Sequence, residues 1–405
     1  MIVQQINTTL NTAAPGRIAE EIGKVLLAHG HSSFIGFGRS ERPSESQLIK
    51  IGNNLDQALH GAKTRLFDKH GFGSHHATAK FVKQIHRINP DIIHLHNIHG
   101  YYLNVDVLFR YLKQAGKPVV WTLHDCWPFT GHCSYFDFVN CSRWETECHH
   151  CPNKHAYPKS WLADNSRQNF FRKRELFTGV DNMVFISPSE WLAQLLKRSF
   201  LKDYPVHVIR NGIDLKSFSP LDNAHQIRQK YALGDKKILL GVASIWDRRK
   251  GFNDFIKLSK LLGKDELVVL IGLSHKQAQD LPENIRGIAR TESLSELAGF
   301  YSLADVFVNP TYVDNFPTTN LEALACGTPV VTYNTGGSPE AIDELTGISV
   351  TKGDAQKLYE AVNQVTALGK SHFRPLCRAR AEKMFDKESR YKDYLSIYNK
   401  LLNIK

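Results

Sequence analysis

Residues 304–340 contain two strand-like runs, and each is followed by a turn and by helix signals. The first run, 305–310, is rich in β-branched and aromatic residues. The helix-like run 320–326 that follows it is closed by Gly327 and Pro329. Strand, turn and helix in immediate succession are the unit of an open α/β sheet with parallel strands. In such a sheet, ligands bind beyond the carboxyl ends of the strands, so this segment is the first place to look for a site.

Two carboxylates, Asp314 and Glu322, lie on either side of the first turn. A carboxylate on the first turn of the helix can hold a diol, such as a ribose edge, through two hydrogen bonds, and a second acid on the loop can hold another sugar. The alternative interpretation is a capping box from Thr319 to Glu322, which requires no ligand. Both interpretations place Glu322 at the start of a helix.

The second turn carries two adjacent glycines, Gly336 and Gly337, followed by Ser338 and Pro339. Serine at the N-cap and proline at the first helical position are typical of a helix start. Two neighbouring helix N-termini would then point at one crevice. Because unpaired backbone N–H groups and the helix dipole both favour anions, the pattern predicts a diphosphate site.

The length of 405 residues predicts two domains, because single cores rarely grow that large. The first half also alternates strands and helices, with a strand at 2–7, a small-residue loop at 8–16 and an amphipathic helix at 17–28. Hydrophobic residues make up 42% and charged residues 22%, as in ordinary globular proteins. We predict a domain boundary near residue 216.

The formal net charge is +11. Such a balance suits a nucleic-acid-binding protein, an enzyme for anionic substrates, or an enzyme on an anionic membrane face. No apolar run approaches the roughly 20 residues that span a bilayer. The first residues form a strand pattern without the basic start of a signal peptide. We therefore expect a cytoplasmic protein.

Histidines follow two strand-like runs of the first half. His94, His96 and His99 suggest a metal site, but no acid or cysteine nearby completes a ligand set. Hydrogen-bonded histidines at a buried strand end are the preferred interpretation. The strand 118–123 ends in His124 and Asp125, a polar pair that should point into a ligand crevice.

Five of the seven cysteines lie between residues 126 and 151. Cys133, Cys141, Cys148 and Cys151 could close a tetrahedral structural zinc site, with one C-x-x-C pair among them. Disulfides and plain buried thiols are the alternatives, and disulfides are less favoured because nothing signals export.

Residues 304–340 resemble the donor-binding signature of the retaining glycosyltransferases of family four, which have the GT-B fold. The resemblance implies two Rossmann-like doubly wound α/β domains facing across a cleft, with a last helix that crosses back to the first domain. The domains would be 1–215, on the acceptor side, and 216–385, which binds the donor, followed by the crossover helix 386–405. The cysteine-rich insert 126–151 resembles that of a subset of the capsule, exopolysaccharide and colanic-acid type.

The resemblance also implies roles for individual residues. Glu322 would hold the ribose, while Asp314 and His124 would contact the sugar. Lys250, with Arg248 or Arg249, would neutralise the diphosphate. The other implied donor-binding positions are Gly16, Arg290, Phe316, Thr318 and Thr319. Two departures from the family pattern stand out: the family usually has Glu at position 314, and often Gly at Pro317.

The expected function is retaining transfer of a hexose-type sugar from a nucleotide-diphosphate sugar, a UDP-sugar in the first instance. The acceptor would be a glycan or a lipid-linked oligosaccharide in surface polysaccharide biosynthesis. Catalysis should need no metal, and the only cofactor considered is the structural zinc. The protein should dock on an anionic membrane, at its inner face, and bind no nucleic acid. The alternatives are a GT-B epimerase of UDP-N-acetylhexosamine and a basic nucleic-acid-binding module.

Overall fold

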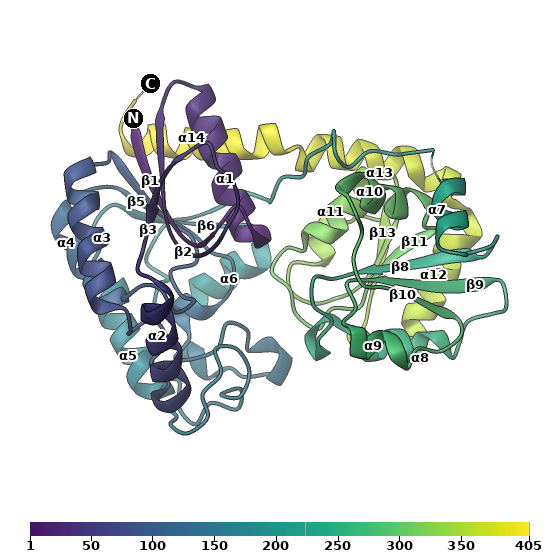
Figure 1. The fold of residues 1–405 in the computed structure, drawn as a ribbon, viewed down its shortest axis with the longest axis horizontal. Coiled ribbons are helices and arrows are strands. Elements are labelled where there is room, and N and C mark those ends of the chain that lie inside the picture. Colours follow the sequence, from purple (N-terminus) through teal and green to yellow (C-terminus); the bar gives the residue numbers. More distant parts are fainter. Residues whose placement is uncertain (223, 405) are drawn as a thin grey trace. The chain divides into compact units, whose positions relative to one another are not determined.

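The computed structural model describes residues 1–222 and 224–404 of the chain. The chain divides into two compact units. Unit 1 contains Met1–Arg210 and the C-terminal residues from Arg390 onward, and unit 2 contains Asn211–Ser389. The last helix therefore returns to the first unit, as the resemblance implied (Figure 1).

Unit 1 is built on a seven-stranded sheet in which every pair of neighbours is parallel. Its strands are β1 (Ile2–Leu10), β2 (Ser32–Glu41), β3 (Gln47–Lys50), β4 (Ile92–Leu95), β5 (Val119–Thr122), β6 (Met183–Ser187) and β7 (Val206–Val208). The order across the sheet is β3-β2-β1-β4-β5-β6-β7. Its helices are α1 (Ala13–Ala28), α2 (Asn54–Phe67), α3 (His75–Ile88), α4 (Val105–Ala115), α5 (Ser166–Phe177), α6 (Glu190–Arg198) and most of α14 (Lys387–Leu401).

The two faces of this sheet bury different side chains because strand residues alternate in direction. Val120 faces the cluster formed with α1 and α14, whereas Val119 and Trp121 face the cluster formed with α3, α4 and α5. Both faces are thus covered by helices, which is the arrangement that parallel sheets require (Figure 1).

Unit 2 repeats this plan with a six-stranded parallel sheet in the order β10-β9-β8-β11-β12-β13. Its strands are β8 (Lys237–Val242), β9 (Glu266–Ile271), β10 (Ile285–Ile288), β11 (Val306–Asn309), β12 (Val330–Tyr333) and β13 (Gly347–Val350). Its helices are α7 (Ala224–Lys230), α8 (Phe252–Ser259), α9 (His275–Gln279), α10 (Leu294–Leu303), α11 (Thr318–Ala325), α12 (Ala355–Leu368) and α13 (Lys370–Phe385).

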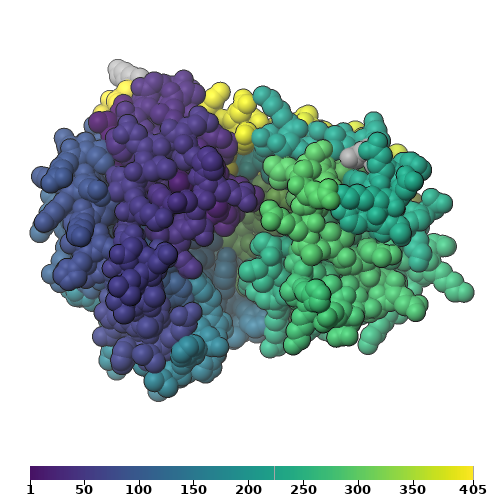
Figure 2. Space-filling view, in the orientation of Figure 1, coloured from purple at the N-terminus to yellow at the C-terminus, as the bar shows by residue number. Residues whose placement is uncertain are grey.

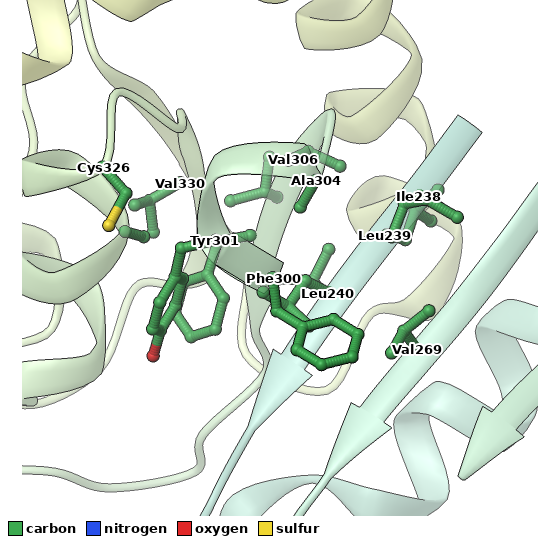
Figure 3. Close-up of a cluster of buried hydrophobic side chains, with 14 of the residues drawn as sticks. Ile238, Leu239, Leu240, Val269, Phe300, Tyr301, Ala304, Val306, Cys326 and Val330 are labelled. Carbon is green, nitrogen blue, oxygen red and sulfur yellow. The ribbon is translucent and has the colours of Figure 1, made fainter. Parts of the chain in front are cut away.

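The core of unit 2 forms where β8 and β9 meet helix α10. Leu240 and Val269 are fully buried, and Phe300 and Tyr301 pack beside them from α10 (Figure 3). Tyr301 is one of the largest fully buried side chains. It matters for the site because it carries a polar hydroxyl into this apolar surrounding.

In both sheets the strand order reverses direction once. The chain runs β8, β9, β10 toward one edge and then continues with β11, β12, β13 toward the other. The reversal in unit 2 lies between β8 and β11, and the reversal in unit 1 lies between β1 and β4. Ligands of open α/β sheets bind outside the carboxyl ends of the strands at such points. The prediction of two doubly wound α/β domains is confirmed.

Some predicted elements differ in detail. Helix α1 begins at Ala13, so the predicted loop 8–16 is mostly the end of β1 and the first turn of α1. Across residues 1–222 and 224–404, no helix combines the length and apolarity needed to cross a membrane.

Candidate active site

The loop after β8 forms a basic turn with a defined conformation. Trp246 anchors its start by donating from Nε1 to the carbonyl of Ile271 at 2.9 Å. A single 3-10 turn, Arg248–Lys250, follows, and the Asp247 side chain caps it by accepting from the Lys250 N–H at 3.0 Å. The local sequence therefore folds three cations onto one short turn at the carboxyl end of β8.

Gly251 ends this turn and allows it to pack against the loop after β11. Its φ is +75°, and a Cβ there would come within 2.1 Å of the Pro310 carbonyl oxygen. No other residue fits that backbone approach. Next to it, the Tyr312 N–H donates to the Arg249 carbonyl at 2.8 Å. The basic turn and the acidic loop are thereby joined through their backbones.

Asp314 is the carboxylate that meets the basic turn. Its Oδ2 accepts a hydrogen bond from Lys250 Nζ and lies 3.9 Å from Arg249 Nη1. Arg249 also donates to the Val313 carbonyl at 3.1 Å, which fixes its direction. The structure therefore brings together two predicted residues that are far apart in sequence, at the junction of β8 and β11.

The charges at this junction fix the state of the carboxyl group. Burial favours the neutral form of Asp314, but Lys250 and then Arg249 outweigh it, so the pKa of Asp314 is lowered. The side chain of Asp314 is 15% exposed and that of Lys250 is 22% exposed. The carboxylate of Asp314 is thus ionised, and both side chains of the pair keep part of their surface accessible to a ligand.

Glu322 lies on α11, which begins at Thr318 after Pro317. Its Oε2 accepts a hydrogen bond of 2.8 Å from the buried hydroxyl of Tyr301. The burial of Tyr301 and the carboxylate beside it raise the pKa of that phenol, which keeps it protonated as the donor. The carboxylate of Glu322 is therefore oriented by the core of unit 2.

The capping-box interpretation of Glu322 is wrong. The N-cap position is occupied by Pro317, whose φ of −68° starts the helix two residues earlier than expected, and no side chain caps it. Thr319 is consequently inside the first turn, and Glu322 is buried against Tyr301. Glu322 therefore does not cap the helix. The role in ligand binding is the interpretation to test.

The second turn differs from its prediction as well. Ser338 precedes a 3-10 turn, Pro339–Ala341, and not a longer helix, so only α11 presents a helical N-terminus here. Ser338 instead accepts from Asn320 Nδ2 at 3.0 Å, and Asn320 Oδ1 accepts from Asn309 at 2.8 Å. This buried network holds α11 against the ends of β11 and β12.

The glycine pair of the second turn supports Asp314 from behind. Gly336 has φ +58°, and a Cβ there would lie 2.0 Å from the Asp314 carbonyl oxygen. The Gly337 N–H donates to that same oxygen at 3.0 Å. The glycines thus allow close approach of two loops of the chain.

The other predicted residues of unit 2 occupy different places. Thr318 and Thr319 form the first turn of α11, where backbone N–H groups have no partner within a helix. Phe316 is 3% exposed, and its ring packs 5.9 Å from that of Phe385. Its ring therefore has a packing role here, and its contact with a donor stays a prediction. Arg290 is exposed just beyond β10, at the edge of the sheet.

In unit 1, His124 follows β5 and its protonation can be read from its neighbours. Gln5 Nε2 donates to the Ala19 carbonyl, so Gln5 Oε1 accepts from His96 Nε2 at 3.0 Å. The other nitrogen of a neutral His96, Nδ1, then accepts from His124 Nε2 at 3.1 Å. His124 is left with an unprotonated Nδ1.

Burial above all lowers the pKa of His124 to about 4, with Asp125 opposing the shift. His124 is therefore neutral near pH 7, and its Nδ1 can accept a hydrogen bond from a hydroxyl group. Asp125 itself pairs with His99, at 2.9 Å between Oδ2 and Nε2. That pairing was missed because the two residues lie on different loops.

The preferred interpretation of the strand-end histidines is confirmed. His94 is fully buried and hydrogen-bonded to Tyr398 at 2.6 Å and to Thr122 at 2.8 Å. His96 is also buried and is hydrogen-bonded to Gln5 and His124. Within the described residues, no group of three or more His, Cys, Asp or Glu side chains is arranged to hold a metal ion.

Gly16 lies in the first turn of α1, close to the end of β1. A Cβ at this position would meet Thr9 Oγ1 at 2.8 Å and the Asn11 nitrogen at 3.2 Å. The absence of a side chain at Gly16 therefore allows α1 to pack closely against the end of β1. Its predicted contact with a donor stays a prediction.

The cysteine-rich insert forms a cluster of free thiols. Cys133, Cys141, Cys148 and Cys151 all line one small cavity beside Phe136 and Trp144. The Cys133 thiol donates to Cys151, which raises the pKa of Cys133 and lowers that of Cys151 to about 7. Four cysteine thiols are ligands that zinc prefers. In this structure Cys133 and Cys151 form a hydrogen-bonded pair, and the four thiols are not arranged as a closed metal site.

Two parallel doubly wound units, with a final helix that returns to the first, define the GT-B class of glycosyltransferases. Solved structures share this fold: sucrose-phosphate synthase from Thermosynechococcus elongatus has a TM-score of 0.73 at 18% identity, covering 100% of this chain and 99% of the other. The Anabaena HepE structure in complex with UDP-glucose has a TM-score of 0.70 at 15% identity, covering 99% of this chain and 100% of the other.

Sequence comparison gives the family. Residues 16–217 match the model of Glycosyltransferase Family 4, and residues 223–383 match that of Glycosyl transferases group 1. The putative colanic acid biosynthesis glycosyl transferase WcaC of Escherichia coli is 26% identical over 375 residues, 89% of this chain and 90% of its own length. The chain belongs to the family-four glycosyltransferases of GT-B fold.

Proposed function

We propose that this protein transfers a hexose-type sugar from a UDP-sugar, with retention of configuration, to a glycan or lipid-linked oligosaccharide in surface polysaccharide biosynthesis. The observation that carries the proposal is the Lys250–Asp314 pair, which lies beside α11 at the junction of β8 and β11. Anabaena HepE, which shares this fold, has been solved in complex with UDP and glucose and with UDP-glucose, and this supports the same class of donor here.

The proposed roles follow from charge and hydrogen-bonding capacity. Glu322 accepts hydrogen bonds from the ribose hydroxyls, and Tyr301 holds its carboxylate in place. Lys250 and Arg249 compensate the charge of the diphosphate, and the N-terminus of α11 adds backbone donors. Arg249 is preferred over Arg248 because it points toward Asp314 while Arg248 is exposed.

The chemistry is electrostatic in this proposal. The bond from the anomeric carbon to the diphosphate oxygen breaks, and the departing UDP takes the electron pair. The acceptor oxygen bonds to the anomeric carbon on the same face of the sugar, and its proton passes to the departing diphosphate oxygen. Preorganised cations and helix N–H groups stabilise the charge that develops on the leaving group, so the chemistry requires no metal ion. Asp314 binds hydroxyl groups of the transferred sugar, and the unprotonated Nδ1 of His124 is able to accept a hydrogen bond from a hydroxyl group.

A thermal-shift screen of nucleotide sugars tests this function. UDP-sugars should raise the melting temperature, because a ligand that binds only the folded state stabilises it. UDP release from the stabilising donor, followed without and then with candidate acceptors, identifies transfer. Stabilisation by GDP- or ADP-sugars alone would correct the donor base. No effect of any nucleotide sugar would contradict the proposed site.

Replacing Glu322 with glutamine should weaken binding of the stabilising nucleotide by about 1.5–3 kcal/mol for each charged hydrogen bond lost. The fold should be retained, because the glutamine oxygen can still accept from Tyr301. Isothermal titration with UDP measures the affinity. Tyr301→Phe is the matched control: it removes the orienting hydrogen bond and should weaken binding less. Unchanged affinity in Glu322→Gln would leave that residue with a structural role only.

We also propose that the four cysteines of the insert bind one structural zinc ion. The proposal rests on four thiols lining one cavity in a loop region with little regular secondary structure. Elemental analysis of the purified protein should show about one zinc per chain, as for a closed four-cysteine site. Replacing Cys148 with serine should abolish the bound zinc, whereas Cys377→Ser, in unit 2, should not. Metal-free protein with four titratable thiols would reject the site.

A further inference from the structure

Helix α2 of unit 1 exposes its apolar face and buries its small and polar one. The buried residues are His60, Gly61 and Thr64. Leu55 and Leu59 are 67% and 61% exposed, and Leu66 follows two turns later on the same side. The spacing of 55, 59 and 66 corresponds to one face of a helix. This is the reverse of an ordinary surface helix, whose leucines face the core.

A second segment extends this apolar surface. The Trp161 N–H donates to the Arg65 carbonyl at 2.7 Å, and the Ala163 N–H donates to the Leu66 carbonyl at 3.2 Å. The Arg65 guanidinium lies 5.6 Å from the centre of the Trp161 ring. We call the whole the α2 surface. Its apolar members are Leu55, Leu59, Leu66, Phe67, Trp161 and Leu162, all exposed.

The α2 surface is bordered by basic groups. Lys63, Arg65, Lys69, Lys154 and Lys159 lie on α2, just after it, or on the adjoining loop. Among the residues that the structure describes, no salt bridge engages any of these five side chains. Asp68, the acid at the end of α2, is fully buried and binds His132. Two further acids lie nearby, Asp56 on α2 and Asp164 on the loop, and each accepts a hydrogen bond from a backbone N–H group. Five cations against these two acids leave the charge beside the apolar residues net positive. The dark indigo α2 region lies uncovered on the face that Figure 2 shows.

We propose that the α2 surface docks on a bilayer of anionic phospholipid, with the leucines, Phe67 and Trp161 entering the headgroup boundary. An apolar helix face with lysine and arginine beside it and a tryptophan at its border matches what interfacial helices require. The lysines pair with lipid phosphates, which are the anionic partners that no salt bridge within the described residues provides for them.

A second copy of this chain is the competing occupant. A symmetric dimer would place the same basic groups against one another, because a two-fold contact uses the same patch on both sides. Lysine is also depleted at protein–protein interfaces. The charge of the α2 surface thus favours lipid over self-association. This docking does not depend on which donor the enzyme uses.

Vesicle sedimentation of the full chain tests the proposal. Binding should be clear with vesicles that contain phosphatidylglycerol, should weaken as salt rises and should be slight with phosphatidylcholine alone. Combining Leu59→Ser with Leu66→Ser should lower binding roughly tenfold or more. The matched control combines Leu345→Ser with Leu368→Ser, two exposed leucines of unit 2, and should bind normally. Equal binding of both variants, or no binding of the wild type to either vesicle, overturns the proposal.

Tryptophan fluorescence gives an independent readout. Trp161 is 53% exposed, while Trp121, Trp127, Trp144 and Trp246 are buried. Adding phosphatidylglycerol vesicles should shift the emission to shorter wavelength, and Trp161→Phe should remove most of that shift. A concentration-dependent dimer that the Leu59→Ser, Leu66→Ser variant abolishes, without lipid binding by the wild type, would assign the surface to a second copy and overturn the proposal. The nucleotide-sugar thermal shift should be unchanged in these variants, so failure here is distinguishable from failure of the proposed function.

Discussion

Replacing Lys250 with methionine should reduce sugar transfer by about 10²–10³-fold, the effect of removing one preorganised charged donor from a developing oxyanion. It should also destabilise unit 2 by about 3 kcal/mol, because Asp314 would keep a half-buried charge without its main partner. Arg249, 3.9 Å away, offsets part of that penalty. Turnover assays with the identified donor and urea unfolding measure the two effects separately.

A double variant separates the structural role of the pair from the catalytic one. Combining Lys250→Met with Asp314→Asn removes both charges, so stability should return to within about 1 kcal/mol of the wild type. Transfer should stay low because the diphosphate has lost its cation. Lys357→Met, an exposed lysine of α12, is the matched control and should change neither quantity. Recovery of activity together with stability would show that Lys250 serves only the fold.

Lowering the pH from 7.5 to 5 should destabilise unit 1 strongly. Burial lowers the pKa of His60 and of His94 to about 3, and that of His124 to about 4. In the unfolded chain these groups titrate near 6.5, so between the two values the unfolded state binds more protons and the free energy of unfolding falls as pH falls. At pH 5, His60 and His94 each cost about 2 kcal/mol.

Burial also lowers the pKa of His70, and hydrogen bonds show why His60 and His70 resist protonation. His60 Nε2 accepts from the Gly71 and Gly73 N–H groups at 3.1 and 3.2 Å. His70 Nε2 accepts from the Gly100 N–H at 3.2 Å. A proton on either nitrogen would set donor against donor inside the core. The stability at neutral pH therefore requires neutral imidazole rings. It is lost over a pH range that lies above the range in which carboxyl groups titrate.

Urea unfolding at a series of pH values, followed by the emission of the buried tryptophans, measures this dependence. His60→Gln should reduce the pH slope between 6.5 and 5 by about one proton, because glutamine can accept the same N–H bonds without titrating. A flat stability profile between pH 7.5 and 5 would contradict the expectation. A change confined to below pH 4 would assign it to carboxyl groups instead.

Local spacing was sufficient to predict much of unit 2. The strand at 305–310 and the acids at 314 and 322 are found where the sequence indicated them, and the helix predicted at 320–326 begins at Thr318. The position of the basic turn was also predictable, since three consecutive cations lie in the loop that follows β8. These features depend on residues within a few positions of one another, where propensity and periodicity act.

The partners of the site residues were not predictable. Tyr301 orients Glu322 from a different helix, and nothing in the sequence near 322 points to it. Asp125 pairs with His99 and not with the adjacent His124 for the same reason. Pro317 replaced the expected cap because a backbone already fixed by proline started the helix earlier. Such contacts depend on which loops the sheet order brings together.

The sequence by itself determined that the chain alternates strands and helices, and that acids and cations follow adjacent turns. Only the tertiary structure decided that Lys250 meets Asp314, because β8 and β11 become neighbours only when the sheet reverses direction. It also decided that Leu55 and Leu59 face outward, although periodicity alone would place them inside. Periodicity specifies that a helix has two faces, and the packing of the whole domain selects which one is covered.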